Sequence, residues 1–385
     1  MPIITADYIY LPEGFAANHF LEVDDTGKII DLGPITSEIQ AAQSLNGVLI
    51  PGFVNTHCHL ELSMMKGVIP RGTGMTGFIL GIVSQRGKYS EAAQTEAVTL
   101  ALQEAWDSGT VAIGDICNGP VSINPKKVFP QLYCHSFIEL LGLNGSQAND
   151  ILNKGRVLAN QFMALPHSLT LHAPYSMSQE LITAIHQTHP SLISVHLLES
   201  AEEREIFETG TGPFIEFYKK IGIPFEGFST SSPIDYVLNE APVNQPIISV
   251  HNTEMTQEEI EDLAKKFPHL YFALCPRANQ YIHGTHPDPN KFLRIMDRVC
   301  LGTDSLASND SLDMLEEIKA LWRKNTWMTT HSLVKWATTN GAKAMRLSDK
   351  FGTFTIGTRP GVNLLKNLDL REIQLTEDAK IEKYY

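Results

Sequence analysis

Short apolar runs alternate with longer amphipathic stretches through most of this chain. The runs that we interpret as strands are residues 49–57, 110–116, 132–139, 169–172, 192–196, 247–251, 271–275 and 299–304. Strands separated by helical patterns are typical of βα units around a parallel sheet. Eight such units predict an α/β fold with a closed, TIM-like (β/α)8 barrel. An open doubly wound sheet is the alternative, and the lack of a G-x-G-x-x-G loop after the first strand disfavours it.

Three predicted helices begin with the capping-box pattern S/T-x-x-E/Q shortly after a strand. The three boxes run from Ser176 to Gln179, from Ser200 to Glu203 and from Thr256 to Glu259. After the third box, apolar residues recur at helical spacing, which predicts one buried stripe formed by Ile260, Leu263, Ala264 and Phe267. The segments between strand ends and boxes are therefore βα loops, on the barrel face where active sites are built.

Both chain ends have a different pattern, with short β segments and frequent turns. At the start these segments are 3–5, 8–10, 19–23 and 29–32, with a hairpin signal at 24–27. Near the end they are 352–357 and 360–365. We predict that residues 1–48 and 348–385 meet in one small β-sandwich domain, and that residues 49–347 form the barrel.

Composition narrows the classes of protein and the partners. A chain of 385 residues that is 43% hydrophobic can bury a large core. Its net charge of −13, with no basic stripe, disfavours binding to nucleic acid. No apolar run reaches the length of a membrane span and no signal peptide precedes the first strand, so we expect a cytoplasmic protein without a membrane partner. Five cysteines without a C-x-x-C pair predict buried, reduced thiols.

The first candidate for chemistry is His57-Cys58-His59 at the end of the first predicted barrel strand. Side chains alternate along a strand, so His57 and His59 point to one face and Cys58 to the other. Two imidazoles side by side are half of a metal site. A chance His-x-His is the alternative in a chain with 14 histidines.

Other predicted strands also end in polar residues. Buried polar side chains are costly unless they are paired or bind a ligand, so their recurrence at one end of many strands predicts a functional site. The further strand-end residues are Asp115, His135 with Glu139 nearby, His172, His196, His251 and Asp304. Glu199 follows His196 by three residues, within reach of whatever that histidine holds. No lysine ends the fourth strand, so the bridging ligand of a second metal is absent there.

In this order and spacing, His57-Cys58-His59, His196-x-x-Glu199, His251 and Asp304 resemble the amidohydrolase superfamily, in particular its mononuclear deaminase branch. The stretches 51–57 and 337–342 are also similar to that family, and the likeness spans essentially the whole chain. The cytidine-deaminase type of zinc site is absent, since Cys275-Pro276-Arg277 leads to no second cysteine.

The resemblance implies a set of roles. His57, His59, His196 and Asp304 would bind one divalent metal, Zn²⁺ first and Fe²⁺ as the alternative, and a bound water would have its pKa lowered to about 7. His251 and Asp304 would orient and deprotonate that water. Glu199 would protonate a ring nitrogen and then the departing amine. The expected reaction is the hydrolytic release of ammonia from an aminated purine nucleoside.

The candidate substrate-binding residues lie on the loops after the strands, and they are Glu61, Arg71, His172, Tyr175, Arg277 and Asn279. In the related adenosylhomocysteine and methylthioadenosine deaminases, the histidine of a similar His-Ala-Pro-Tyr loop contacts the substrate, and an acidic residue after the first strand binds the ribose. Residues 65–79 contain no acidic residue here, and Glu61 is the nearest substitute.

Arg71 and Arg277 would suit a substrate that carries a carboxylate, because a guanidinium group binds a carboxylate through two hydrogen bonds. The chain resembles, in motifs and overall length, the deaminases that act in the menaquinone route on 6-amino-6-deoxyfutalosine, an adenine nucleoside with a carboxyphenyl group. The resemblance makes this nucleoside our leading substrate. A surface or interdomain salt bridge is the alternative role for these arginines. The open alternatives for function are a deaminase of adenosylhomocysteine, methylthioadenosine, guanine or a triazine, a cyclic-amide hydrolase, and a non-catalytic barrel. Similar proteins are commonly homo-oligomers, which leaves that state possible.

Overall fold

The parallel strands form two sheets in a computed structural model that describes residues 2–39 and 43–385. The first sheet has the order β6-β7-β8-β9 and the second the order β10-β11-β12-β13. Their bounds are β6 Phe53–Cys58, β7 Thr110–Cys117, β8 Tyr133–Leu140, β9 His167–Leu171, β10 Ile193–Leu197, β11 Ile247–His251, β12 Leu270–Leu274 and β13 Val299–Leu301. All the predicted barrel strands are thus present as parallel strands of an α/β fold.

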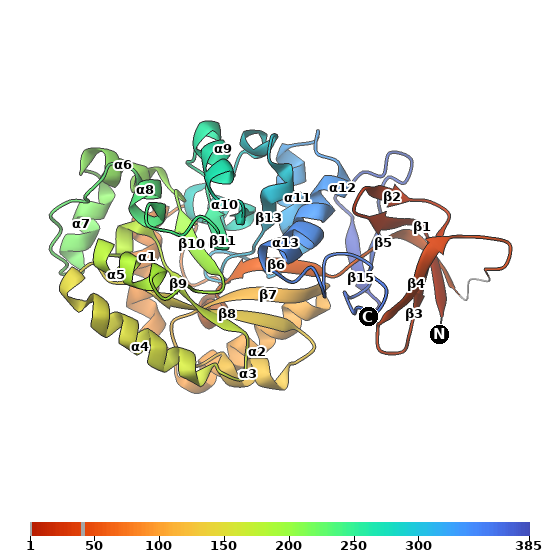
Figure 1. The fold of residues 1–385 in the computed structure, drawn as a ribbon, viewed down its shortest axis with the longest axis horizontal. Coiled ribbons are helices and arrows are strands. Elements are labelled where there is room, and N and C mark those ends of the chain that lie inside the picture. The colour runs from red at the N-terminus through yellow and green to blue at the C-terminus, as the bar shows by residue number, and fades with distance from the viewer. Residues whose placement is uncertain (1, 40–42) are drawn as a thin grey trace.

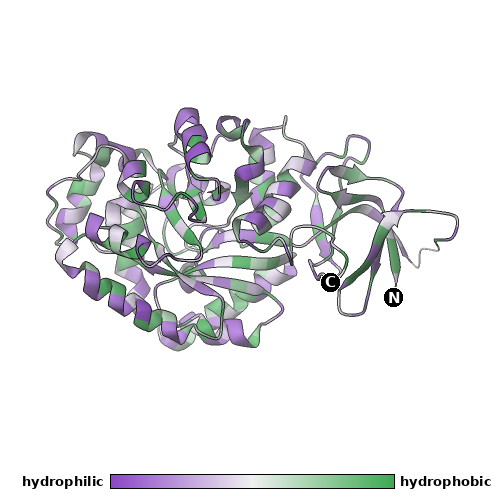
Figure 2. Cartoon of the chain, viewed as in Figure 1, coloured by the Kyte–Doolittle hydropathy of each residue, from purple (hydrophilic) through white to green (hydrophobic). Residues whose placement is uncertain are grey.

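Helices lie outside these strands (Figure 1), and they mix hydrophilic with hydrophobic residues, whereas the central strands are largely hydrophobic (Figure 2). The helices are α1 Gly74–Gln85, α2 Glu91–Asp107, α3 Ile123–Val128, α4 Ala148–Gln161, α5 Gln179–His186, α6 Ala201–Thr209, α7 Pro213–Lys220, α8 Pro233–Leu238, α9 Gln257–Lys266, α10 Pro276–His283, α11 Met314–Lys324, α12 Thr330–Lys335 and α13 Gly341–Ala344. In the part of the chain that the structure describes, no helix is both long and apolar enough to cross a membrane.

The two parallel sheets approach each other at both edges. Between β6 and β13, the His57 carbonyl accepts hydrogen bonds of 3.1 Å from the backbone N–H groups of Thr303 and Asp304. Between β9 and β10, the N–H of His196 donates to the His172 carbonyl at 2.9 Å. The strands form two separate four-stranded sheets, so the closed barrel stays a prediction.

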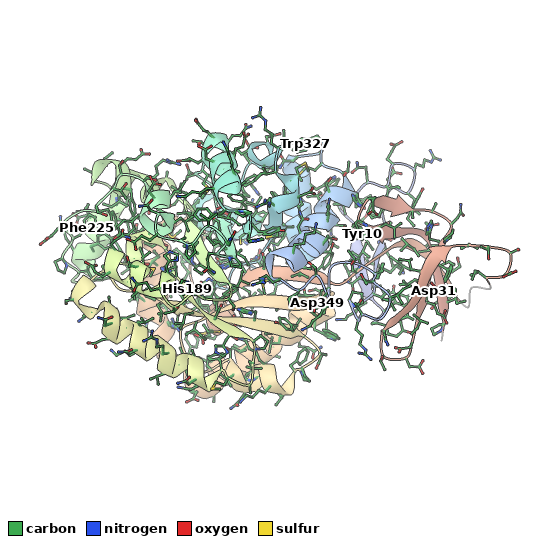
Figure 3. The ribbon with its side chains drawn as sticks, viewed as in Figure 1. Tyr10, Asp31, His189, Phe225, Trp327 and Asp349 are labelled. Carbon is green, nitrogen blue, oxygen red and sulfur yellow. The ribbon has the colours of Figure 1, made fainter. Side chains whose placement is uncertain are left out.

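Strands from both chain ends share one further sheet, of order β15-β14-β5-β1-β3-β4 with β2 paired to β1. Its strands are β1 Ile3–Leu11, β2 Gly14–Ala16, β3 His19–Val23, β4 Ile29–Pro34, β5 Gln43–Ile50, β14 Asn363–Lys366 and β15 Lys380–Lys383. Among the described residues, the end strands make this single sheet, and the predicted sandwich of two sheets is not seen. Figure 3 labels Tyr10 where this sheet meets the larger body and Asp31 at its far end. The Tyr10 hydroxyl contacts the Thr339 hydroxyl at 2.7 Å across that junction.

The predicted strand 49–57 is in fact two strands. β5 ends at Ile50 in the end sheet, and β6 begins at Phe53 in the parallel sheet. Pro51 lacks the backbone N–H that a strand ladder needs. Gly52 packs closely against Val111, where a Cβ would lie 2.2 Å from Cγ1, so only glycine fits at this point. The chain therefore leaves one sheet and enters the other at Pro51-Gly52. The predicted β segment 352–357 was also wrong, since these residues form bends and turns.

The predicted capping boxes have three different outcomes. Thr256 caps α9 with both reciprocal hydrogen bonds to Glu259, as predicted. Ser176 does not cap α5, because Ser178 does so by accepting from the Leu181 N–H, while Ser176 ends the preceding 3₁₀ turn. Ser200 caps α6, but the Glu203 side chain does not return to the Ser200 N–H.

Candidate metal centre and active site

Four side chains from distant parts of the chain converge at the carboxyl ends of the parallel strands. They are His57 and His59 around the end of β6, His196 in β10 and Asp304 after β13. The Nε2 atom of His59 lies 3.1 Å from Nε2 of His57 and 3.2 Å from Nε2 of His196. Oδ1 of Asp304 lies 3.3 Å from Nε2 of His59 and 3.6 Å from Nε2 of His57.

These separations fit a tetrahedral metal ion. Ligand atoms at about 2.0–2.1 Å from a tetrahedral Zn²⁺ stand about 3.3 Å from one another. The Nε2 atoms of the three imidazoles converge at this range. Their lone pairs can therefore bind one cation together. The ligand atoms also lie close enough to one another to hold an ion in two sets of three residues that include His57. These sets are His57, His59 and His196, and His57, His251 and Asp304.

The protonation states favour ligation. Burial lowers the pKa of His59 to about 3 and the pKa of His196 well below its ordinary value, so both rings are neutral at pH 7 with a free lone pair. Burial opposes the charge on Asp304, but its hydrogen bond to His57 and the other nearby histidines hold the pKa of this carboxyl below its usual range. Two neutral imidazoles and a carboxylate are ligands that Zn²⁺ prefers.

Local geometry explains why these side chains point inward together. Cys58 alternates with the histidines and packs on the other face, in a cluster with residues of α2, as the strand pattern predicts. Asp304 and His251 have φ values of 56° and 71°, in the left-handed region that non-glycine residues rarely occupy. Such backbone conformations cost of order 1–3 kcal/mol and persist only where the surrounding structure holds them. Here the backbone N–H of Asp304 donates to the His57 carbonyl, and Ser308 donates to its carboxylate.

Glu199 and His251 stand beside the metal centre. Oε2 of Glu199 lies 3.6 Å from Nε2 of His251, and both side chains are buried. Burial, followed by the nearby Asp304 carboxylate, raises the pKa of Glu199 well above its ordinary value. A raised pKa favours the protonated form of a carboxyl group, which is the form that can donate a proton. Asn279, a candidate for substrate contact, is fully buried in α10, and neither polar atom of its side-chain amide has a hydrogen-bond partner among the described residues. Its nearness to His251 tends to raise the pKa of that ring, against the larger effect of burial.

The candidate substrate residues of the fourth βα loop divide into two groups. The His172 ring centroid lies 5.0 Å from that of His196, and its Nδ1 is 2.6 Å from the Ser176 hydroxyl, which leaves Nε2 available. Tyr175 is buried against Phe214, with ring centroids 4.6 Å apart. His172 is thus in position to contact a ligand at the metal centre, whereas the Tyr175 ring belongs to the core.

Glu61 is committed to other contacts. Its carboxylate accepts from the backbone N–H groups of Asn118 and Gly119 at 3.0 and 3.1 Å, and it pairs with Arg86 at 3.2 Å. Burial, followed by Asp115, raises the pKa of Glu61 to about 7. These partners fix the loop after β7, so a substrate hydroxyl would have to displace one of them to reach Glu61.

Arg71 and Arg277 do come together, but around a carboxylate of the chain itself. Arg71 contacts Asp310 at 2.5 Å, and Arg277 lies 3.5 Å from the same carboxylate. Arg277 also donates to the Ser311 hydroxyl at 2.7 Å. The side chain of Asp310 is 60% exposed, so solvent or a ligand can reach this ion-pair cluster. The two guanidinium groups therefore share one carboxylate on the rim of the strand ends.

Two glutamates at the site were marked by the sequence pattern but received no role there, Glu139 as a strand-end residue and Glu203 as part of a capping box. Glu139, in β8, receives a hydrogen bond from Asn118 and has a buried Oε1 atom 3.8 Å from Nδ1 of His196. Its strand neighbour His135 was a strand-end candidate, but it lies near the start of β8 and contacts Ser168 instead. Only the capping pattern at Ser200 drew attention to Glu203, which proves to hold the backbone beside Glu199.

The parallel strands with outer helices bring a His-x-His pair, a histidine and an aspartate together at the strand ends, with ligand atoms close enough to hold a metal ion. The model of the amidohydrolase family matches residues 48–382. The chain therefore belongs to the amidohydrolase family, and it is a hydrolase that acts on C–N bonds.

Curated relatives cover most of the chain. It is 27% identical over 350 residues to an adenosine deaminase of Helicobacter pylori, which covers 84% of this chain and 81% of that protein. It is 27% identical over 355 residues to an aminodeoxyfutalosine deaminase of Nitratiruptor sp., with 88% and 82% covered.

Solved structures share the fold. Helicobacter pylori aminofutalosine deaminase in complex with methylthio-coformycin aligns with a TM-score of 0.77 at 24% identity, over 98% of this chain and 94% of that one. An adenosine deaminase from Xanthomonas campestris with bound zinc aligns with a TM-score of 0.69 at 19% identity, over 97% and 86%. At these identities the likeness supports the fold alone.

Proposed function

We propose that this protein is a metal-dependent deaminase that hydrolyses an aminated purine nucleoside and releases ammonia. The observation that carries the proposal is the pairing of a four-donor centre with the buried Glu199 beside it, whose pKa burial raises. Relatives named as deaminases of adenosine and aminodeoxyfutalosine support the same reaction.

His57, His59, His196 and Asp304 would hold one divalent metal, with Zn²⁺ as the expected ion. When bound, such a metal lowers the pKa of a water molecule to about 7 and so supplies a nucleophile at neutral pH. His251 would orient the attacking water, and Asp304 would take its proton. Glu199 would donate its proton to a ring nitrogen of the purine, take up the proton of the added hydroxyl as the C=O forms, and pass it to the departing amine, which leaves as ammonia. The proton held by Asp304 would then restore Glu199. The net reaction exchanges the ring C–NH2 for C=O at the cost of one water.

The leading substrate is 6-amino-6-deoxyfutalosine. Its carboxylate would replace that of Asp310 between Arg71 and Arg277, while His172 would contact the purine nucleoside. The relative from Nitratiruptor is named an aminodeoxyfutalosine deaminase, which supports this choice. The exposed position of Arg71 and Asp310 also suits a group at the far end of a long substrate.

The barrel is part of the same proposal. The hydrogen bonds from Thr303 and Asp304 to His57, and from His196 to His172, support closure of the eight parallel strands into a (β/α)8 barrel. Closure would bring β6 and β10 to opposite sides of one metal ion, which is what a shared ligand set requires.

The test is ammonia release by the Zn²⁺-loaded protein with 6-amino-6-deoxyfutalosine, adenosylhomocysteine, methylthioadenosine, adenosine, guanine and a cyclic amide. We expect turnover of the purine nucleosides, with 6-amino-6-deoxyfutalosine preferred. Preference for another purine would retain the reaction and change the substrate. Ring opening of the cyclic amide without any release of ammonia would contradict the deaminase.

A further inference from the structure

Glu203 is a fully buried carboxylate that the proposed reaction does not use. It lies in the first turn of α6, where the capping pattern predicted a bond back to Ser200. Instead, its Oε1 accepts the backbone N–H of Leu198 at 3.0 Å, and its Oε2 accepts the backbone N–H of Glu199 at 3.1 Å. One side chain therefore satisfies two consecutive N–H groups of the segment that carries Glu199.

The segment needs such support because its backbone is strained. Leu198 has a φ of 48°, in the left-handed region that residues other than glycine, asparagine and aspartate rarely adopt. This turn ends β10 at Leu197 and redirects the chain, so that the Glu199 carboxyl faces His251. On the other side, the Leu198 carbonyl accepts the N–H of Glu254 at 2.9 Å. The turn is thus held at both its N–H and its carbonyl.

The neighbouring residue Glu202 makes the same kind of contact elsewhere. Its two carboxylate oxygens accept the backbone N–H groups of Met75 and Thr76 at 3.2 and 3.0 Å, at the start of α1. The side chain of Thr73, the cap residue of α1, accepts no hydrogen bond from the N–H groups of the helix, so Glu202 replaces that cap. Two adjacent glutamates therefore each bind two backbone N–H groups, one pair at a helix start and the other beside Glu199.

We infer that Glu203 is a positioning residue, which fixes the backbone of Leu198 and Glu199 and thereby aims the Glu199 carboxyl at the reacting ring. The inference rests on the proposed function, since it is Glu199 that transfers the proton there. An isosteric glutamine offers one acceptor oxygen and one NH2 donor, so one of the two backbone N–H groups would face a donor. Displacement of a reacting group by about 1 Å can cost about 100-fold in rate.

The experiment compares Glu203→Gln with Glu202→Gln in the full-length, Zn²⁺-loaded protein. It measures kcat and KM with 6-amino-6-deoxyfutalosine and adenosine, metal content, Tm, and amide hydrogen exchange at residues 198 and 199. We expect both variants to lose a similar amount of Tm and to keep their metal. Only Glu203→Gln should lower kcat, by about 10- to 100-fold with little change in KM, and exchange faster at 198 and 199.

Equal effects of the two variants on kcat, or unchanged exchange at 198 and 199 in Glu203→Gln, would overturn the inference. Faster exchange with an unchanged kcat would overturn it as well. Glu199→Gln separates this failure from failure of the proposed function. If Glu199→Gln retains full activity, the proton-transfer role is wrong; if it is inactive while Glu203→Gln behaves like Glu202→Gln, only the positioning role is wrong.

Discussion

The Glu199 carboxylate oxygen Oε2 lies 3.6 Å from Nε2 of His251, and neither side chain belongs to the four donors that converge on the metal centre. Burial raises the pKa of Glu199 and lowers the pKa of His251 to about 3. Both shifts favour the uncharged form, a protonated Glu199 carboxyl beside a neutral His251 imidazole. Metal binding and proton transfer to the substrate ring can be tested separately, because Glu199 is not one of the four metal donors.

Substitution of Glu199 should abolish the reaction without removing the metal. Glu199→Gln keeps the shape of the side chain but has no proton to donate, and general acid–base catalysis contributes about 100- to 10,000-fold to a rate. We expect a loss of that size in kcat, with metal content equal to that of the wild type by elemental analysis. Normal turnover in a metal-replete Glu199→Gln protein would show that another group transfers the proton.

Substitution of a ligand should remove the metal and the activity together. His57→Ala deletes one of the three imidazoles that lie 3.1–3.2 Å apart in series. We expect substoichiometric Zn²⁺ after dialysis and a proportional loss of ammonia release. Cys58→Ser is the matched control, since the Cys58 side chain packs with α2 on the other face. Metal loss in the serine variant would contradict the alternation of the strand.

The arginine pair can be tested through Asp310. If Arg71 and Arg277 bind a substrate carboxylate, Asp310 competes for the same guanidinium groups. Arg277→Ala should then lower kcat/KM for 6-amino-6-deoxyfutalosine by about 10- to 100-fold, the value of a hydrogen bond to a charged group, and leave adenosine nearly unaffected. Asp310→Asn should lower KM for the carboxylate substrate only. Parallel changes for both nucleosides would instead assign the arginines to a structural salt bridge.

The stability of the protein should depend on pH through Glu317, a buried carboxyl in α11 that accepts hydrogen bonds from the Arg277 backbone N–H and the Asn309 side-chain amide. Burial raises the pKa of Glu317 from 4.5 to about 8. The native state therefore keeps a proton that the unfolded state releases between these values, and this stabilisation is present below pH 4.5 and is lost as the pH rises to 8.

Glu317→Gln removes this titration. We expect the unfolding free energy of the variant minus that of the wild type to increase from pH 5 to pH 8, with a slope of up to about 1.4 kcal/mol per pH unit. Urea denaturation of the metal-free proteins measures it. Glu316→Gln removes a less buried carboxylate from the same helix and serves as the control. A constant difference between Glu317→Gln and wild type across this range would mean that Glu317 is ionised throughout.

Much of the site follows from local rules that the sequence contains. The two-residue period of a strand places His57 and His59 on one face and Cys58 on the other, whatever the rest of the fold. Apolar runs that alternate with amphipathic stretches predict parallel strands and outer helices, because those periods decide which faces are buried. His196, His251 and Asp304 stood out in the sequence as polar residues at the ends of apolar strands. Burial of such residues without a partner destabilises the fold, so their presence indicates a ligand or a function.

Tertiary structure decided what depends on loop conformation and long-range contact. The sequence pattern joined residues 49–57 into one strand, but packing of Gly52 against Val111 divides it between two sheets. Asp310 meets Arg277 from another loop, and Glu203 turns from its own helix cap to the N–H groups of Leu198 and Glu199. A side chain with several possible partners takes those that the fold brings within about 3 Å, and residues far apart in sequence meet there only after the strands have assembled.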